Sequence, residues 1–246
     1  MNETAKTFDY IVQARRSVRI YNQEDVFDGD AVQRSLERAV LAPNSSNMQL
    51  WEFYRITDAA KRKKIAQFCM NQNAAKTARE LVVVVVRKDK WRNRAKFMYN
   101  YHKNRIGDKP KTGYTKRDKR NLYYFGRLMP MYYFSDWLGL WGWVRKCIVF
   151  IASFWRPVVW QVSNADLRVV CHKSAALAAQ TFMLSMQAEG YDTCPMEGFD
   201  SWRVKRYLNL PFSAEINMII ACGKAAPGGI YNERIRVPSG EVIFNL

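Results

Sequence analysis

The sequence predicts a layered fold of the α+β or α/β type, in which a sheet is covered by helices. The unbroken apolar run at 81–86 and the largely apolar segment at 216–222 have the length and composition of buried strands. Segments with helical spacing alternate with these runs along the chain. The 246 residues, 48% of them hydrophobic, can bury a substantial core. We expect one domain over residues 1–246, with an insertion at about 88–164.

The first third of the chain predicts helices and strands in alternation. Residues 4–14 have apolar positions at roughly helical spacing and lead into a cluster of arginines, so a helix delivers positive charge to a loop. A second helix is expected over 30–41 and is stopped by Pro43. Residues 51–56 alternate like a strand, and a helix over 59–70 precedes the apolar run.

The last third predicts one long helix followed by strands. Residues 165–189 have helical character, and Gly190 is placed to end the helix. The run at 216–222 is the second buried strand, and 241–244 are expected to form a short terminal one. No GxGxxG follows a strand and no GxxxxGK[ST] occurs, so the common dinucleotide and P-loop sites are not supported.

Charge and cysteine usage limit the classes of partner and compartment. Lysine and arginine number 39 against 22 acidic residues, and the net charge of +17 predicts attraction to an anionic partner. The five cysteines are widely spaced and only two histidines accompany them, so neither a disulfide framework nor a metal site is expected. The first residues lack the features of a secretory signal, and we expect a cytoplasmic protein.

The segment that interrupts the fold between 87 and about 164 has two compositions. Residues 88–127 hold fourteen Lys or Arg against three Asp. Residues 137–160 hold five of the eight tryptophans, namely Trp137, Trp141, Trp143, Trp155 and Trp160. The first half has the composition of a solvated surface, and the second half predicts an apolar contact surface.

A basic cluster follows the first helix, in the order Arg15, Arg16, Ser17, Arg19. Two guanidinium groups and a hydroxyl at a helix end can hold a phosphate through charge-assisted hydrogen bonds. Taken alone, the cluster is equally compatible with a solvated helix end.

Four further segments are informative when they are considered together with this cluster. They are the loop APNSSNMQLW at 42–51, the turn NAAK at 73–76, the segment GYDTCPMEGFD at 190–200 and the extended RIR at 234–236. Alternating cations on an extended segment point to one side, so Arg234 and Arg236 can reach a single phosphate. Alone, each segment also fits a simple structural role: a helix stop, a surface turn, a connection or an edge strand.

In their order along the chain, these segments together resemble the signature segments of the nitroreductase family. The resemblance covers the two ends of the chain and not its middle, and it departs from the family's pattern at Asn44 and Leu50. It implies an α+β three-layer sandwich with a central, mostly antiparallel sheet flanked by helices. It also implies a homodimer whose C-terminal segments are exchanged, with flavin mononucleotide (FMN) held at the subunit boundary.

The resemblance assigns roles residue by residue. The implied phosphate site consists of Arg15, Arg16, Ser17, Arg19, Arg234 and Arg236. The loop residues that would contact a flavin bound mainly to the other subunit are Pro43, Asn44, Ser45 and Asn47. Asn73 and Lys76 would meet the pyrimidine edge, where a cation favours the reduced anionic flavin. The segment Pro195, Met196, Glu197 and Gly198 would run along the ring, with backbone N–H groups near 197 and 198 facing flavin N5.

The implied activity needs no catalytic side chain, because a flavin carries the redox chemistry itself. NADH or NADPH is expected as electron donor, and a nitroaromatic, a quinone or a similar electrophile as small-molecule acceptor. Neither the acceptor nor the preferred nicotinamide can be read from the sequence.

Two other classes of function remain open for the interrupting segment. Its tryptophans and flanking cations suit a peripheral contact with an anionic membrane, or else a lid or dimer contact over the flavin pocket. A spanning helix is not expected, because the uncharged stretches are under ten residues and a bilayer requires roughly 20. Tyrosines interleaved with the basic run allow nucleic-acid stacking, but no known reading module matches and this role is disfavoured.

Overall fold

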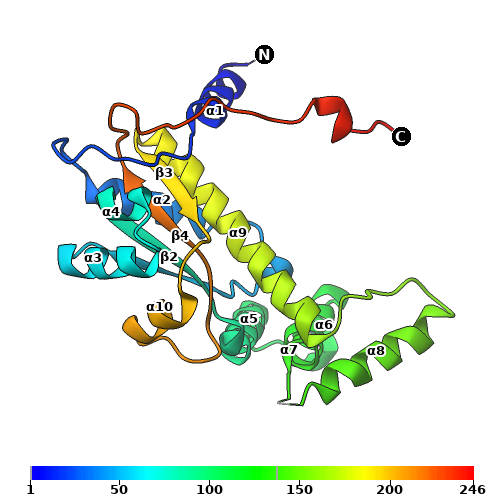
Figure 1. Cartoon of the computed structure of the whole chain (residues 1–246). Helices are drawn as coiled ribbons and strands as arrows, with labels where there is room; N and C mark the ends of the chain where they lie inside the picture. Colours follow the sequence, from blue (N-terminus) through cyan, green and yellow to red (C-terminus); the bar gives the residue numbers. More distant parts are fainter. Residues whose placement is uncertain (1, 137) are drawn as a thin grey trace.

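A four-stranded sheet with the order β1-β2-β4-β3 forms the centre of the molecule. The computed structural model describes residues 2–136 and 138–246. The strands are β1 (Trp51–Ile56), β2 (Glu80–Val86), β3 (Asp192–Met196) and β4 (Glu215–Gly223), and every neighbouring pair is antiparallel (Figure 1). The α+β alternative of the sequence prediction is therefore confirmed.

Helices cover both faces of this sheet, which gives three layers. One face packs against α2 (Gly29–Ala39) and α9 (Asn164–Ala188). The other face packs against α3 (Ala59–Phe68), α4 (Asn73–Thr77) and α10 (Ser201–Tyr207). Alternate residues of β2 divide between the two cores: Val82 and Val84 face α9, while Leu81 and Val83 face α3. This explains why the run from 81 to 86 is apolar at every position.

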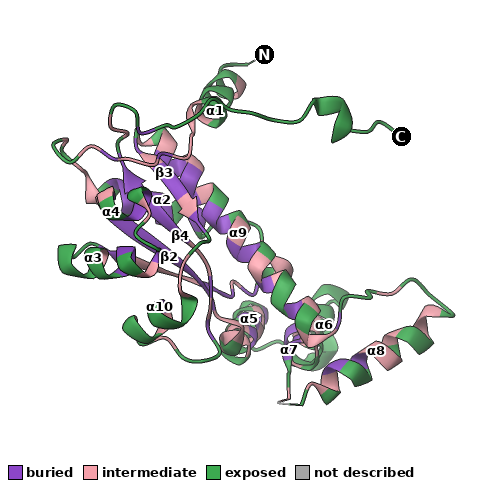
Figure 2. Ribbon diagram, in the orientation of Figure 1, coloured by how far each residue is buried: buried purple, intermediate pink, exposed green. Residues whose placement is uncertain are grey.

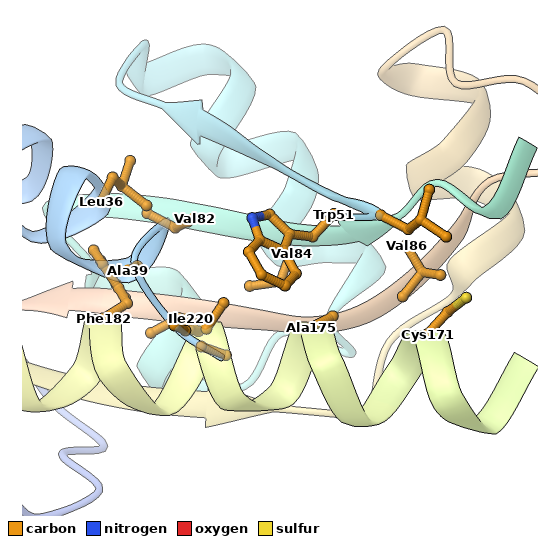
Figure 3. Close-up of a cluster of buried hydrophobic side chains, with 14 of the residues drawn as sticks. Leu36, Ala39, Trp51, Val82, Val84, Val86, Cys171, Ala175, Phe182 and Ile220 are labelled. Atoms are coloured by element: carbon orange, nitrogen blue, oxygen red, sulfur yellow. The ribbon is translucent and has the colours of Figure 1, made fainter. Parts of the chain in front are cut away.

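The larger core lies between β2 and α9 (Figures 2 and 3). Ala175 and Ala178 are fully buried on α9 and let the helix backbone approach the sheet closely, while Phe182 fills the space beside them. Ser163 and Asp166 form a capping box at the start of α9. Gly190, with φ +80°, follows its end, as predicted for a C-terminal cap.

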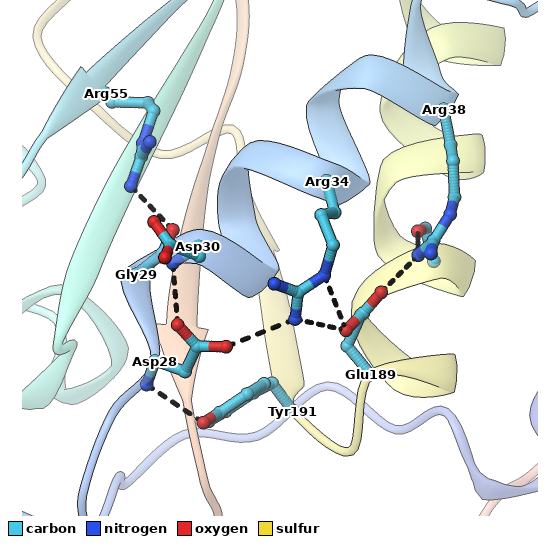
Figure 4. A network of polar contacts seen from close by, with 9 residues as sticks. Asp28, Gly29, Asp30, Arg34, Arg38, Arg55, Glu189 and Tyr191 are labelled. Atoms are coloured by element: carbon cyan, nitrogen blue, oxygen red, sulfur yellow. Dashed lines mark hydrogen bonds and ion pairs between the residues drawn. The ribbon is translucent and has the colours of Figure 1, made fainter.

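An ion-pair network ties α2 to the end of α9. Arg34 Nη2 lies 2.7 Å from a carboxylate oxygen of Glu189 and 3.1 Å from one of Asp28, and Arg38 Nη1 lies 2.5 Å from the other Glu189 oxygen (Figure 4). Arg55 reaches the same corner from β1 and donates to the main-chain oxygen of Gly29 at 2.9 Å. The network holds the two helices of one layer at a fixed spacing.

Between β2 and α9 the described residues form four α-helices, which lie in the predicted interrupting segment. They are α5 (Trp91–Ile106), α6 (Lys116–Tyr123), α7 (Met129–Tyr133) and α8 (Leu140–Ser153), with a π-helical turn η4 (Tyr124–Leu128) joining α6 to α7. The helices α5, α6 and α7 pack on one another, whereas α8 extends away from the sheet at the far end of the molecule (Figure 1). Within the described residues no helix has both the length and the apolar character needed to cross a bilayer.

Two predictions about the elements need correction. The strand expected at 241–244 is wrong: the chain there leaves the body and forms a single 3₁₀ turn, η5 (Ser239–Glu241). Its alternating residues pair with no strand, because this end of the chain lies away from the sheet. The helix expected over 59–70 ends at Phe68, since Met70 and Asn71 adopt left-handed backbone angles.

Candidate functional site

The predicted basic cluster lies along the edge of the sheet beside β3. Helix α1 (Glu3–Ala14) has Arg15 as its C-terminal cap residue, and Ser17 then forms a parallel bridge with Thr193. Val18 is fully buried and donates its main-chain N–H to the Thr193 carbonyl at 3.2 Å. Because Val18 faces the core, the neighbouring positions 17 and 19 face away from it. The strand-like pairing therefore holds Ser17 and Arg19 on the outer side.

The C-terminal segment returns to this edge and closes the cluster from the other side. Arg19 donates its main-chain N–H to the Gly229 carbonyl at 2.7 Å. A Cβ at position 229 would lie 2.3 Å from the Ile20 carbonyl oxygen, so only glycine allows this approach. The side chain of Arg16 also donates to the Asn232 carbonyl at 2.5 Å.

These segments enclose an open cavity of about 730 Å³. Seven residues predicted for the cofactor site line it: Arg15, Arg16, Ser17, Arg19, Asn73, Arg234 and Arg236. They come from both ends of the chain and from the start of α4. The structure thus brings the residues of the predicted phosphate site together in one cavity.

The electrostatics of this cavity favour an anion. Five arginines line it together with one acidic residue, Glu233. Across residues 2–136 and 138–246, every ion pair within 4.0 Å involves cations other than these five. The pKa of Arg15 is lowered by burial and then by the positive charges of Arg234 and Arg236. Unneutralised cations at close range repel one another, and a bound phosphate would relieve this repulsion.

The segment after β3 is connected to the cavity through one hydrogen bond. Gln72, which lines the cavity, donates from Nε2 to the Gly198 carbonyl at 2.7 Å. A Cβ at Gly198 would lie 3.3 Å from that Nε2 atom, so the small residue suits the close contact. Of the other predicted residues here, Pro195 is half-buried, Met196 is buried in the core and Glu197 is exposed. None of these four residues lines the cavity, and Gly198 contacts it through Gln72.

Lys76 and the loop at 43–47 do not belong to this cavity. Lys76 is exposed on α4, beyond the lining residues. The loop residues Pro43, Asn44, Ser45 and Asn47 lie instead beside α9 and the π-helical turn: the Ser45 N–H donates to Ser174 Oγ at 3.3 Å. The hydroxyls of Ser46 and Tyr124 lie 2.6 Å apart.

The loop backbone is unusual. Ser46, Asn47 and Gln49 have φ values of 55°, 51° and 47°, so three non-glycine residues occupy the left-handed region within four positions. Such conformations cost free energy and are held by their surroundings, here by the Asn44 Oδ1 atom, which accepts from the Gln49 N–H at 2.9 Å. This loop is a second candidate contact surface, separate from the arginine cavity.

Several lining residues were missed by sequence reasoning. Asn71, Gln72, Tyr231 and Asn232 all line the cavity. The Asn73 side chain donates from Nδ2 to the Tyr231 hydroxyl at 2.9 Å and so joins α4 to the C-terminal segment. The polar run NQN at 71–73 was the available signal.

Fold and site together define an α+β protein with an arginine-lined cavity suited to a phosphate-bearing ligand. The model of the "Nitroreductase family" matches residues 12–224, and the chain belongs to this family. The predicted resemblance is confirmed.

Individual relatives and structures agree with this assignment. Protein DrgA of Synechocystis is 28% identical over 243 residues, which cover 96% of this chain and 94% of that protein. The putative NAD(P)H nitroreductase YdgI of Bacillus subtilis is 22% identical over 236 residues, 94% of this chain and 96% of that one. A putative nitroreductase of Exiguobacterium sibiricum, solved in complex with FMN, has the same fold, with a TM-score of 0.66, 21% identity and 97% coverage of both chains.

Proposed function

We propose that this chain is an FMN-dependent oxidoreductase that transfers hydride from NADH or NADPH to a nitroaromatic, a quinone or a similar electrophilic acceptor. The observation that carries the proposal is the cavity in which five arginines converge, none of them paired with a carboxylate in the part of the chain that the structure describes. Membership of the nitroreductase family, the NAD(P)H named for one relative and the FMN named for one structure support it.

The residues of the cavity fit the phosphate end of FMN. Arg15, Arg16, Ser17 and Arg19 supply charge and hydrogen-bond donors on one side, and Arg236 supplies charge from the C-terminal segment. Arg234 has a different task, because its guanidinium already donates to main-chain carbonyls of the first helix. We assign to Arg234 the positioning of the segment that carries Arg236.

The remaining contacts are proposed by resemblance and by position. Asn73 and Lys76 are assigned to the pyrimidine edge, and the segment from Pro195 through Met196 and Glu197 to Gly198 to the length of the ring. When bound, FMN would supply the electron-transfer chemistry, and no side chain of this chain is assigned as nucleophile, acid or metal ligand. The protein binds, orients and tunes the group electrostatically.

Two surfaces that the single chain leaves uncovered support a homodimer. Helix α1 has no buried residue, although it carries Phe8 and Tyr10, which are 54% and 71% exposed. The C-terminal segment exposes Ile235, and the last residues of the chain leave the body and expose Phe244. We propose that a second copy covers both and brings its strained loop at 43–47 to the flavin site. The unpaired cysteines fit a reducing compartment, and we place the enzyme in the cytoplasm.

The proposal is tested by absorbance spectroscopy of the purified protein. We expect a yellow protein, or one that takes up added FMN with a shift in its visible spectrum. NADH or NADPH should then bleach the flavin absorbance under anaerobic conditions, and a panel of quinones and nitroaromatics should restore it. A colourless protein that takes up no FMN would contradict the proposal, whereas bleaching without reoxidation by the panel would reject only the acceptor class.

A further inference from the structure

We propose that α8 and the cations of a neighbouring cavity form a docking surface for an anionic phospholipid bilayer. We call residues 138–160, which contain α8, the arm. This inference concerns a part of the molecule that the flavin site does not use, and it stands independently of the proposed redox function.

The arm presents an apolar face without a partner in the chain. Only Gly142 and Arg145 of α8 are buried. The exposed side of the helix and the residues that follow it are large and apolar: Leu140, Trp143, Val144, Ile148, Phe150, Ile151, Phe154 and Trp155, with exposed fractions from 38% to 78%. A continuous exposed apolar surface of this kind marks an interaction site.

The arm is held in this orientation by a buried arginine. Arg145 is 7% exposed and donates to four main-chain carbonyls, those of Met131, Tyr132, Phe134 and Val162, at 2.6 to 3.2 Å. Its remaining nitrogen, Nη2, donates to Asn164 Oδ1 at 2.9 Å. Five bonds to one guanidinium fix the rotation of the helix. These bonds therefore hold the apolar face in a fixed orientation, and α8 is not a frayed end of the fold.

The start of α8 is also fixed by hydrogen bonds, here to an aspartate. Asp136 accepts from the N–H groups of Leu140 and Trp141, both at 2.8 Å. A Cβ at Gly142 would lie 3.2 Å from the main-chain nitrogen of Asn164, so the helix closely approaches the start of α9.

A cavity whose lining includes cations adjoins the base of the arm. A cavity of about 290 Å³, lined by Trp91, Pro130, Met131, Phe134 and Trp141, opens at the base of the arm. Trp91 and Pro130 also line a second cavity of about 640 Å³, whose lining includes Arg92, Lys96 and Arg127. These three cations are exposed, and among the described residues no carboxylate lies within 4.0 Å of them.

This combination matches the interface of an anionic leaflet. Tryptophans favour the headgroup level of a bilayer, apolar side chains enter the boundary of the acyl chains and cations attract anionic lipid headgroups. The helix has 14 residues, which gives about 21 Å at 1.5 Å per residue, too short to span a hydrocarbon core of about 30 Å. It therefore lies in the plane of the leaflet.

Charge distinguishes this occupant from a second copy of the chain. Residues 88–160 contain seventeen Lys or Arg against four acidic residues, so two copies meeting at this face would bring like charges together. No residue of α8 lines the arginine cavity, which argues against a lid over that cavity in the same chain. An anionic bilayer satisfies both the apolar and the cationic parts of the surface.

Vesicle flotation with the FMN-treated full chain tests the proposal. The vesicles contain phosphatidylcholine alone or with phosphatidylglycerol, at low and at high salt. We expect the wild type to float with the phosphatidylglycerol vesicles and to be released by salt. The double variant Trp143→Ala, Trp155→Ala and the double variant Arg92→Gln, Arg127→Gln should each lose about tenfold or more in apparent affinity.

Two matched controls locate the binding surface. Trp202→Ala removes an exposed tryptophan of α10, and Arg105→Gln removes an exposed cation that lines neither cavity of the docking surface; both should float like the wild type. Circular dichroism checks that all variants are folded.

Three outcomes would overturn the proposal. They are failure of the wild type to float at low salt, equal flotation of the arm variant, and equal binding to both vesicle types. A change of the arm variant's mass in light scattering, with no flotation of the wild type, would identify the face as a subunit contact instead. Vesicle binding by a protein that takes up no FMN would reject the redox proposal and leave this one intact.

Discussion

Arg234 donates from one guanidinium nitrogen to the main-chain carbonyl of Arg15 at 2.5 Å and to that of Gln13 at 3.0 Å. The carbonyls at the end of a helix lack partners within the helix and form the negative end of its dipole. A cation from the far end of the sequence satisfies them here. The contact fixes the C-terminal segment against the first helix and thereby builds one side of the arginine cavity.

Gly229→Ala should damage this construction. The new Cβ would meet the Ile20 carbonyl at 2.3 Å and the Ala226 carbonyl at 2.9 Å, so backbone must move. We expect the free energy of unfolding to fall by about 1–3 kcal/mol and FMN retention to weaken. Thermal unfolding with and without FMN measures both. Gly113→Ala is the control, because nothing lies within 4 Å of the added atom; an equal loss in the two variants would contradict the packing argument.

Phe182→Ala should be the more costly of two identical substitutions. Phe182 is fully buried between α9 and the sheet, and its truncation leaves a cavity that costs about 3–5 kcal/mol. Phe212 is 97% exposed, so the same change there should cost less than about 1 kcal/mol. Urea unfolding followed by circular dichroism compares the two variants. Similar midpoints would show that Phe182 is not in the core.

The contribution of Glu189 to stability should depend on pH. Hydrogen bonds from Arg34 and then Arg38 lower the pKa of Glu189 from 4.5 to about 2. Because the pKa in the folded state is depressed, the stabilisation is present above about pH 4.5 and is lost as the pH falls toward 2. Glu189→Gln should therefore lower the free energy of unfolding by about 0.5–1 kcal/mol at neutral pH. The difference from the wild type should vanish near pH 2 in denaturant titrations, and a difference that is constant with pH would be the contrary result.

Thiol labelling should separate the five cysteines. Burial raises the pKa of Cys69 and of Cys171 to about 12 and also raises the pKa of Cys194 and Cys222. Thiolate is the reactive form, so these four should react at least about tenfold more slowly with iodoacetamide than the half-buried Cys147. Peptide mass spectrometry gives the order of labelling, with denatured protein as the reference. Rapid labelling of Cys194 would show an accessible thiol beside the arginine cavity.

The sequence predicted the elements whose pattern has a single physical reading. The apolar run of β2 needs two covered faces, and Gly190 needs a left-handed backbone after α9; both are observed. The alternating residues at 241–244 failed as a prediction, because alternation forms a strand only where a neighbouring strand offers hydrogen bonds, and within the described residues this tail pairs with no strand.

The candidate site was predictable only where the type of residue itself indicates its role. The arginines at 15, 16, 19, 234 and 236 carry charge that identifies them in the sequence, and they meet in one cavity. Tyr231 and Gln72 belong to the site through hydrogen bonds, Tyr231 with Asn73 and Gln72 with Gly198. These pairings depend on the tertiary path of the chain. The left-handed backbone angles of Ser46 and Asn47 were likewise not predictable, because neither residue is a glycine.

The most direct test of the central claim compares the binding of FMN with that of riboflavin, which lacks the phosphate. If the arginine cavity holds the phosphate, FMN should bind the wild type at least about 100-fold more tightly than riboflavin in a fluorescence titration. Arg15→Ala and Arg236→Ala should each lose about tenfold or more of that preference, while Arg105→Ala, outside the cavity, should retain it. Equal affinity for FMN and riboflavin, or an unchanged preference in both cavity variants, would contradict the account.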